Sequence, residues 1–247
     1  MNFNYLIWAL VAIMYTPIFY RLYKVGWSDD YSHAYFIFPI VLWLIWRKRA
    51  ELKQIFQNTP YVKNFFSLPV FLLGLLMFVF GWHQDYDFIL TFSLIPLSLG
   101  LTTYIYGMNI TKAVSFPLFY LIFLVPPPAA VLDAITLPMR HGVSVVAEII
   151  LRFFDYPITR NGLLITVGYN EIFMGAPCSG FRSLITMFSL VLAYVYISKG
   201  ALLKKFVLAA LIIPFALVGN VLRVITLCLI TFYFGEEAGQ GFFHNFS

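Results

Sequence analysis

The sequence predicts an all-α polytopic membrane protein with about seven membrane-spanning helices, an interfacial amphipathic helix and a small extracytoplasmic β-hairpin. Of its 247 residues, 61% are hydrophobic and only 11% are charged, and the mean hydropathy is +0.85. Soluble domains usually carry about 25% charged residues. A soluble domain of this composition would have too little polar surface to face water. Long apolar runs and an uneven distribution of basic residues between the loops support the same class.

The apolar runs predict membrane helices in order along the chain. We expect them at residues 3–20, 33–46, 65–82, 88–106, 113–125, 180–198 and 206–234. The first run lacks the basic start and small-residue cleavage site of a signal peptide, so we interpret it as a helix that is retained. The run at 113–125 is shorter than the roughly 20 residues a bilayer requires, so its ends should extend into the neighbouring loops.

The basic residues predict the orientation. The loops after the second, fourth and sixth runs hold nine of the sixteen Lys and Arg residues: Arg47, Lys48, Arg49, Lys53, Lys63, Lys112, Lys199, Lys204 and Lys205. By the positive-inside rule these loops and the N-terminus are cytoplasmic. The net charge of +5 therefore reflects sidedness, and we expect membrane lipid but no nucleic acid as a partner.

The segment at residues 126–177 is the only long part of the chain without a predicted span. It opens with three prolines, which cannot continue a regular helix. Residues 134–154 read as an amphipathic helix in the interface plane, since Arg140, His141, Glu148 and Arg152 interrupt apolar positions. Residues 158–173 combine β-branched residues with glycines, which predicts a β-hairpin that leads the chain toward Cys178.

A polar stretch at residues 175–183 is the best candidate for a reactive site. Ser179 or its neighbours can cap a helix that begins near Gly180. A cysteine at a helix N-terminus faces unpaired N–H groups, which favours the thiolate of Cys178. Arg182, about one turn further on, would act in the same direction. The alternative is that Cys178 only packs, as buried cysteines commonly do.

A single arginine interrupts the last apolar run. Arg223 lies eighteen residues beyond Lys205, about 27 Å along a helix at about 1.5 Å per residue, which places it near the outer boundary together with Cys178. A charge in such a helix should face a polar cavity or a partner. The alternative is that Arg223 reaches the lipid headgroups. Gly219 and Asn220 favour an inward-facing polar surface, whereas Cys228 reads as a packing residue.

The four histidines, His33, His83, His141 and His244, all fall on the outer side, so topology does not choose between them. A structural or catalytic metal site needs three or four converging ligands. No HExxH motif or paired CxxC motif is present. We therefore expect no metal and no other cofactor.

Three blocks together resemble the exosortase/archaeosortase family of membrane cysteine transpeptidases. They are Ala-Pro-Cys-Ser-Gly-Phe-Arg-Ser at 176–183, Gly-Asn-Val-Leu-Arg-Val at 219–224 and Phe-His-Asn at 243–245. The segments at 27–49 and 126–162 also resemble the family, so the likeness runs from about residue 27 to residue 244. Members generally continue into a further membrane helix, so we expect residues 1–247 to form one integral membrane domain without that final helix.

The resemblance implies a function and a site. Cys178 would be the nucleophile, Arg223 would stabilise the oxyanion or orient the peptide, and His244 would be the general acid and base. Ser179, Gly180, Arg182 and Asn220 would support them. The substrates would be secreted proteins that end in a short motif, a membrane helix and basic residues, the PEP-CTERM type, with an acceptor that the resemblance does not identify. The enzyme would act at the extracytoplasmic face of the cell (inner) membrane.

Two other functions fit the composition. A small-molecule transporter would place charged or broken helices near the bilayer midplane, often in two related halves. Here the polar groups gather at one face and no half-repeat is evident, which disfavours a transporter. A non-catalytic scaffold of an export or exopolysaccharide system would have the same topology but would tolerate the loss of Cys178.

Overall fold

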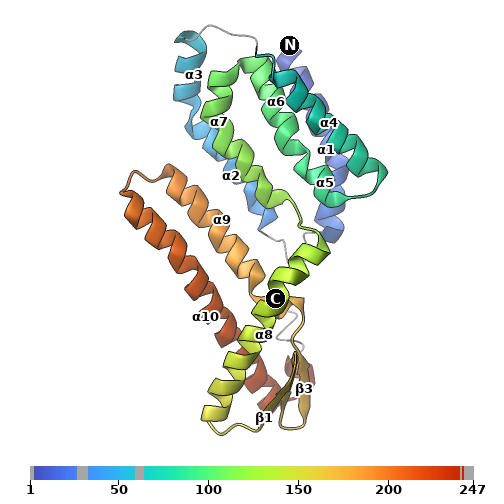
Figure 1. The fold of residues 1–247 in the computed structure, drawn as a ribbon, viewed down its shortest axis with the longest axis vertical. Coiled ribbons are helices and arrows are strands. Elements are labelled where there is room, and N and C mark those ends of the chain that lie inside the picture. The colour runs from blue at the N-terminus through green and yellow to red at the C-terminus, as the bar shows by residue number, and fades with distance from the viewer. Residues whose placement is uncertain (1–2, 27–32, 59–63, 240, 242–247) are drawn as a thin grey trace. The chain divides into compact units, whose positions relative to one another are not determined.

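The computed structural model describes residues 3–26, 33–58, 64–239 and 241, and divides into two compact units, residues 1–128 and 129–247 (Figure 1). Helices dominate both units, as the sequence predicts, and the described strands all lie in the second unit. Among the described residues, helices occupy all seven of the segments that were predicted to span the membrane.

The first unit contains the N-terminal helices. They are α1 (Phe3–Arg21), a π-helical turn η1 (Leu22–Gly26), α2 (Ala34–Arg47), α3 (Arg49–Asn58), α4 (Ser67–His83), α5 (Asp87–Phe92), α6 (Leu94–Tyr106), α7 (Met108–Tyr120) and a 3₁₀ turn η2 (Leu121–Leu124). The short run predicted at 113–125 does extend at its start, because α7 begins at Met108 and η2 continues it to Leu124.

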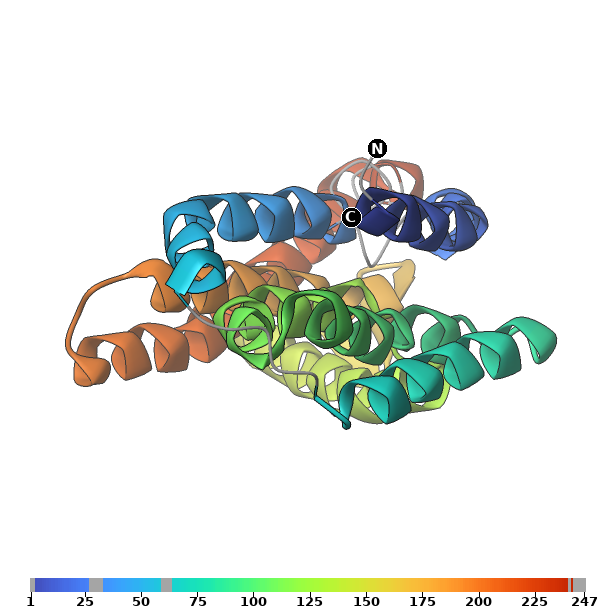
Figure 2. The ribbon, with the colours of Figure 1, turned by 90° about the horizontal axis from the view of Figure 1, so that it is seen from above.

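Close packing of α4 against α6 forms the centre of the first unit, and Figures 1 and 2 show the two helices side by side. Glycine makes this approach possible: a Cβ on Gly74 would overlap the backbone of Leu97, and one on Gly100 would overlap Phe71. Small residues permit such contacts between membrane helices. A buried hydrogen bond of 2.6 Å joins the hydroxyls of Tyr15 and Ser93 at the break between α5 and α6.

The second unit contains α8 (Ala129–Phe153), β1 (Ile158–Asn161), β2 (Leu164–Val167), β3 (Asn170–Phe173), a 3₁₀ turn η3 (Ala176–Ser179), α9 (Phe181–Ile197) and α10 (Leu202–Phe234). Within it α9 lies antiparallel to the first half of α10, whereas α8 and the sheet pack against the second half (Figure 1). At about 1.5 Å per residue, the 33 residues of α10 cover about 50 Å, more than the roughly 30 Å of a bilayer core.

The predicted β-hairpin is a three-stranded antiparallel sheet with the order β1-β2-β3. Each connection has two residues, Gly162-Leu163 and Gly168-Tyr169, and each glycine has a positive φ. A glycine with positive φ at the first position is typical of the type II′ turn, whose twist matches that of the strands. The prediction placed a two-stranded hairpin within residues 158–173, whereas the structure forms three strands there, the first of which is β1 with the sequence Ile-Thr-Arg-Asn.

The sheet, α8 and the second half of α10 enclose the core of the second unit. Its buried members are Val143, Ala147, Leu151, Ile158, Ile165, Val167, Met174, Cys178, Val224 and Cys228. Polar contacts fasten the same elements together. Asn170 donates a hydrogen bond of 3.1 Å to the carbonyl of Thr231, and Glu148 on α8 accepts one of 2.9 Å from Arg160 on β1.

The predicted count of about seven spans is not confirmed. Among the described residues, four helical segments are long and apolar enough to cross a membrane: Asn4–Lys24, Asp87–Tyr106, Ala129–Phe153 and Leu202–Phe234. Four apolar helices are shorter: Ala34–Arg47, Ser67–His83, Met108–Leu124 and Phe181–Ile197. The helix at Ala129–Phe153, which we predicted from residue 134 and placed in the interface, thus begins earlier and has the length of a span.

Candidate functional site

Cys178 lies in the turn that connects the sheet to α9. The chain leaves β3, forms η3 and enters α9 through Gly180. The N–H of Cys178 donates to the carbonyl of Gly175 at 3.0 Å, and the hydroxyl of Ser179 accepts a bond of 3.2 Å from the N–H of Phe181. These bonds hold the cysteine backbone at the start of the helix. Its side chain is buried, with 2% exposed.

Asn220 on α10 interlocks with this turn. Its Nδ2 donates a hydrogen bond of 2.7 Å to the carbonyl of Cys178. Gly180, with φ +72°, leaves the space that Asn220 occupies, because a Cβ on Gly180 would lie 2.7 Å from Asn220 Cγ. Asn220 Oδ1 is buried without a hydrogen-bond partner among the described residues. It is therefore an acceptor available inside the site.

Arg223 lies one turn beyond Asn220 on the same helix. Burial raises the pKa of the Cys178 thiol to about 11, and the guanidinium of Arg223 is the largest influence that opposes it, followed by the Gly175 hydrogen bond and by Arg140. A nearby positive charge stabilises a thiolate more than a thiol. The structure thus brings Cys178, Asn220 and Arg223 together within the second unit.

The expectation that Cys178 would be a thiolate is wrong for the site as it stands. The helix N-terminus and Arg182 are only the sequence neighbours of the sulfur. The sheet, α8 and α10 remove water from the sulfur, and this desolvation disfavours the charged form more than the nearby charges favour it. Arg182 itself is half-buried on the first turn of α9.

Arg140 is a site residue that the sequence reasoning missed, since it appeared there only as a polar interruption of α8. Only 8% of Arg140 is exposed, and its charge lowers the pKa of Cys178. The signal was present in the helix periodicity. Thr136, Arg140, Val143, Ser144, Ala147 and Leu151 are the buried residues of α8. Arg140 lies four residues after Thr136 and three residues before Val143, so it belongs to the same buried face of the helix.

The predicted histidine, His244, lies outside the described residues, so the site is defined here without it. His33 is buried at the start of α2 in the first unit, and His83 and His141 are exposed. Cys228, predicted to pack, is fully buried in the same core as Cys178. No group of three or more His, Cys, Asp or Glu residues in the described part of the chain could hold a metal ion.

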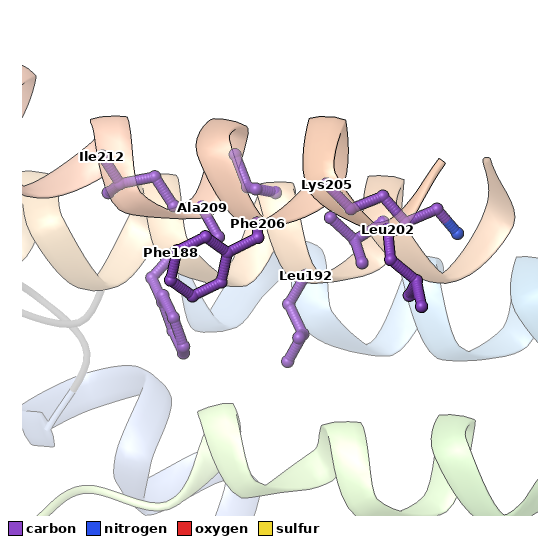
Figure 3. Close-up of a pocket in the computed structure, with 9 residues that line it drawn as sticks. Phe188, Leu192, Leu202, Lys205, Phe206, Ala209 and Ile212 are labelled. Atoms are coloured by element: carbon purple, nitrogen blue, oxygen red, sulfur yellow. The ribbon is translucent and has the colours of Figure 1, made fainter. Parts of the chain in front are cut away.

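A cavity of about 230 Å³ lies elsewhere, between α9 and the first part of α10 (Figure 3). Its lining is apolar except for Lys205: Phe188, Val191, Leu192, Val195, Leu202, Lys205, Phe206, Ala209 and Ile212. Ile212 precedes Asn220 by eight residues, which is about 12 Å along a helix. This cavity is therefore separate from the Cys178 site.

The model of the transmembrane exosortase family matches residues 26–247. The chain belongs to this family. The match covers the three blocks around Cys178, Arg223 and His244, as well as most of the first unit. No curated relative and no solved structure matches the chain.

Exosortases form a family of membrane cysteine transpeptidases, so membership supports a membrane transpeptidase role in general. The apolar helices agree with a membrane protein. The exosortase match thereby favours an enzyme over a transporter.

Proposed function

We propose that this exosortase cleaves the C-terminal sorting signal of secreted proteins at the extracytoplasmic membrane face and transfers them to an acceptor. Cys178 is the nucleophile, Arg223 stabilises the oxyanion or orients the peptide, and His244 is the general acid and base. The observation that carries the proposal is the placement of one buried thiol, in the turn before α9, within reach of the Arg223 charge. A single cation has a large effect in such a poorly solvated site.

The reaction follows as two acyl transfers. His244 takes the proton of the Cys178 thiol while the sulfur attacks the scissile carbonyl, and Arg223 faces the resulting oxyanion. The C–N bond then breaks, His244 gives its proton to the leaving amine, and a thioester remains on Cys178. In the second half, His244 takes the proton of the acceptor nucleophile, which attacks the thioester. The thiolate leaves and regains its proton.

The raised pKa of Cys178 supports a role for a base in the first step. With a pKa of about 11, only about one thiol in 10⁴ is ionised at pH 7. A nucleophile that is protonated at rest needs its proton removed as it attacks. A histidine, with an ordinary pKa of about 6.5, is suited to that transfer near neutral pH.

The length of α10 supports an extracytoplasmic site. Lys204 and Lys205 lie in its first turn, and Asn220 and Arg223 lie more than four turns later. If the lysines mark the cytoplasmic boundary, about 20 residues of helix bring the chain to the opposite boundary. Cys178 bonds to Asn220, which lies about one helical turn before that level. The sheet and the end of α10 then extend beyond the membrane.

Processing in cells tests the proposal. A tagged secreted protein that ends in a PEP-CTERM-type motif, membrane helix and basic tail is co-expressed with the exosortase, and its size is followed on a gel. We expect shortening with the wild type and none with Cys178→Ala. Cys228→Ala is the matched control, because it removes a second buried thiol from the same core, and it should retain processing.

The outcomes separate the alternatives. Equal shortening with Cys178→Ala would assign the cleavage to another protease and overturn the role of the thiol. Absence of shortening with every variant, with both proteins shown to be present in the membrane, would favour the scaffold. Loss of processing in both cysteine variants would indicate a packing role for the two residues.

A further inference from the structure

Arg140 is held on the buried face of α8 by two short-range bonds. Its Nη2 donates to Asp133 Oδ1 at 3.2 Å and to Thr136 Oγ1 at 3.1 Å. Thr136 lies one turn earlier on the helix and is itself buried. The Nε of Arg140 is buried and has no hydrogen-bond partner among the described residues. The guanidinium is therefore held through Nη2, and its buried Nε–H remains without a partner among the described residues.

The face that carries Arg140 also reaches Cys178. α8 packs against η3, and Val143 and Ala147, one and two turns after Arg140, belong to the core that contains Cys178. Residues three and four apart in a helix share a face. The charge of Arg140 acts on the thiol from α8, whereas Arg223 acts on it from α10.

The charges around the site are unbalanced. An arginine stays protonated even when it is buried. Among the described residues, the carboxylate that pairs with Arg140 is that of Asp133, whose side chain is 68% exposed, so solvent weakens its influence. The positive charges of Arg140 and Arg223 thus act on the buried sulfur of Cys178, whereas the carboxylate of Asp133 is exposed to water. The two cations thus offset part of the cost of a negative charge in this desolvated site, and the buried Nε–H of Arg140 is a donor without a partner among the described residues.

We propose that Arg140 is a second charge-stabilising residue at Cys178, which shares with Arg223 the negative charge that forms on the sulfur and then on the substrate carbonyl oxygen, and that Asp133 and Thr136 are its positioning residues. The part that concerns the carbonyl oxygen rests on the proposed transpeptidase reaction. The part that concerns the sulfur does not, because ionisation of the thiol needs no substrate.

The test measures the rate of Cys178 alkylation by a small neutral reagent, iodoacetamide, between pH 7 and pH 11.5. The purified full chain carries Cys228→Ala, so one thiol remains. Limited access of the reagent to Cys178 lowers the alkylation rate by the same factor at every pH. The pKa of the thiol sets the pH at which the rate is half-maximal. The charged side chains nearest to this turn in the sequence and on the helices that pack against it, among them Asp133, Arg182 and Arg223, are kept unchanged.

We expect Arg140→Gln to move the midpoint to higher pH and to slow alkylation at pH 8 about three- to tenfold, as loss of a nearby opposite charge does. Arg140→Lys should restore most of the rate. Arg152→Gln is the control, because Arg152 lies on the same helix but is 64% exposed and pairs with Glu148. It should leave the curve unchanged. Arg140→Met, of similar length and without a buried charge, replaces Arg140→Gln if that variant does not fold.

Identical curves for the wild type and the neutral Arg140 variants would overturn the proposal. A shift of the same size with Arg140→Lys would also overturn it, because the effect would then come from packing and not from charge. The processing assay is read separately. A shifted alkylation curve with no substrate cleavage by the wild type would contradict the transpeptidase reaction and leave the pairing of Arg140 with Cys178 intact.

Discussion

Replacement of Gly180 by alanine should destabilise the turn that holds Cys178, because it affects both the backbone of the turn and its contact with Asn220. Gly180 has φ +72°, a conformation that costs a residue with a side chain about 1–2 kcal/mol. The new Cβ would lie 2.7–2.9 Å from three atoms of Asn220. Asn220 would have to move and lose its hydrogen bond to Cys178, which costs about 1–3 kcal/mol because both groups are buried.

The expected loss is therefore about 2–5 kcal/mol of unfolding free energy, or about 5–15 °C in Tm for a chain of this size. A coumarin maleimide that fluoresces on reaction with thiols can follow the melting in detergent, since both cysteines are buried in the folded chain. Gly219→Ala is the control: it adds a methyl group one residue before Asn220, where nothing lies within 4 Å. It should be neutral or slightly stabilising.

A double variant tests the cause. If the clash with Asn220 dominates, Asn220→Ala should relieve part of it, so Gly180→Ala with Asn220→Ala should lose less than the sum of the two single changes. The reasoning would be refuted if Gly180→Ala melted within about 2 °C of Gly219→Ala, a difference of less than about 1 kcal/mol.

Two further predictions concern the sheet and the orientation. Glu148→Gln should lower stability by about 1–3 kcal/mol, because Arg160 would lose its charged partner; Arg152→Gln, which breaks the exposed arm of the same network, should cost less than about 1 kcal/mol. Equal Tm losses for the two variants would contradict this. In a chain without native cysteines, Tyr169→Cys, at a fully exposed turn, should react with a membrane-impermeant maleimide in intact cells. Glu51→Cys should react only after permeabilisation, and the reverse pattern would invert the proposed topology.

The sequence alone located most helices, because the determinants of a membrane helix are local. An apolar run satisfies its own backbone hydrogen bonds and needs only length and hydropathy to be recognised. Each of the seven predicted segments is helical in the structure. Local signals did not determine the length of every helix. The sequence predicted an interfacial helix from residue 134, whereas the helix begins at Ala129 and has the length of a span.

The sequence also singled out Cys178, Asn220 and Arg223, since polar and small residues are conspicuous among apolar ones. Their relation to one another depended on the tertiary structure. Asn220 bonds to the Cys178 carbonyl across 42 residues of chain, and no helical or strand periodicity links positions that far apart. The space that admits this bond is the missing side chain of Gly180.

The protonation of the thiol was decided by the fold, and it reversed the prediction from the sequence. Neighbours in the chain favour a thiolate, but the sheet, α8 and α10 exclude water from the sulfur and raise its pKa. The contribution of Arg140 arises in the same way, because α8 brings a residue 38 positions away to the turn that holds Cys178. Local sequence determines which groups are present, whereas burial and distance determine their charge, and both depend on how the second unit packs.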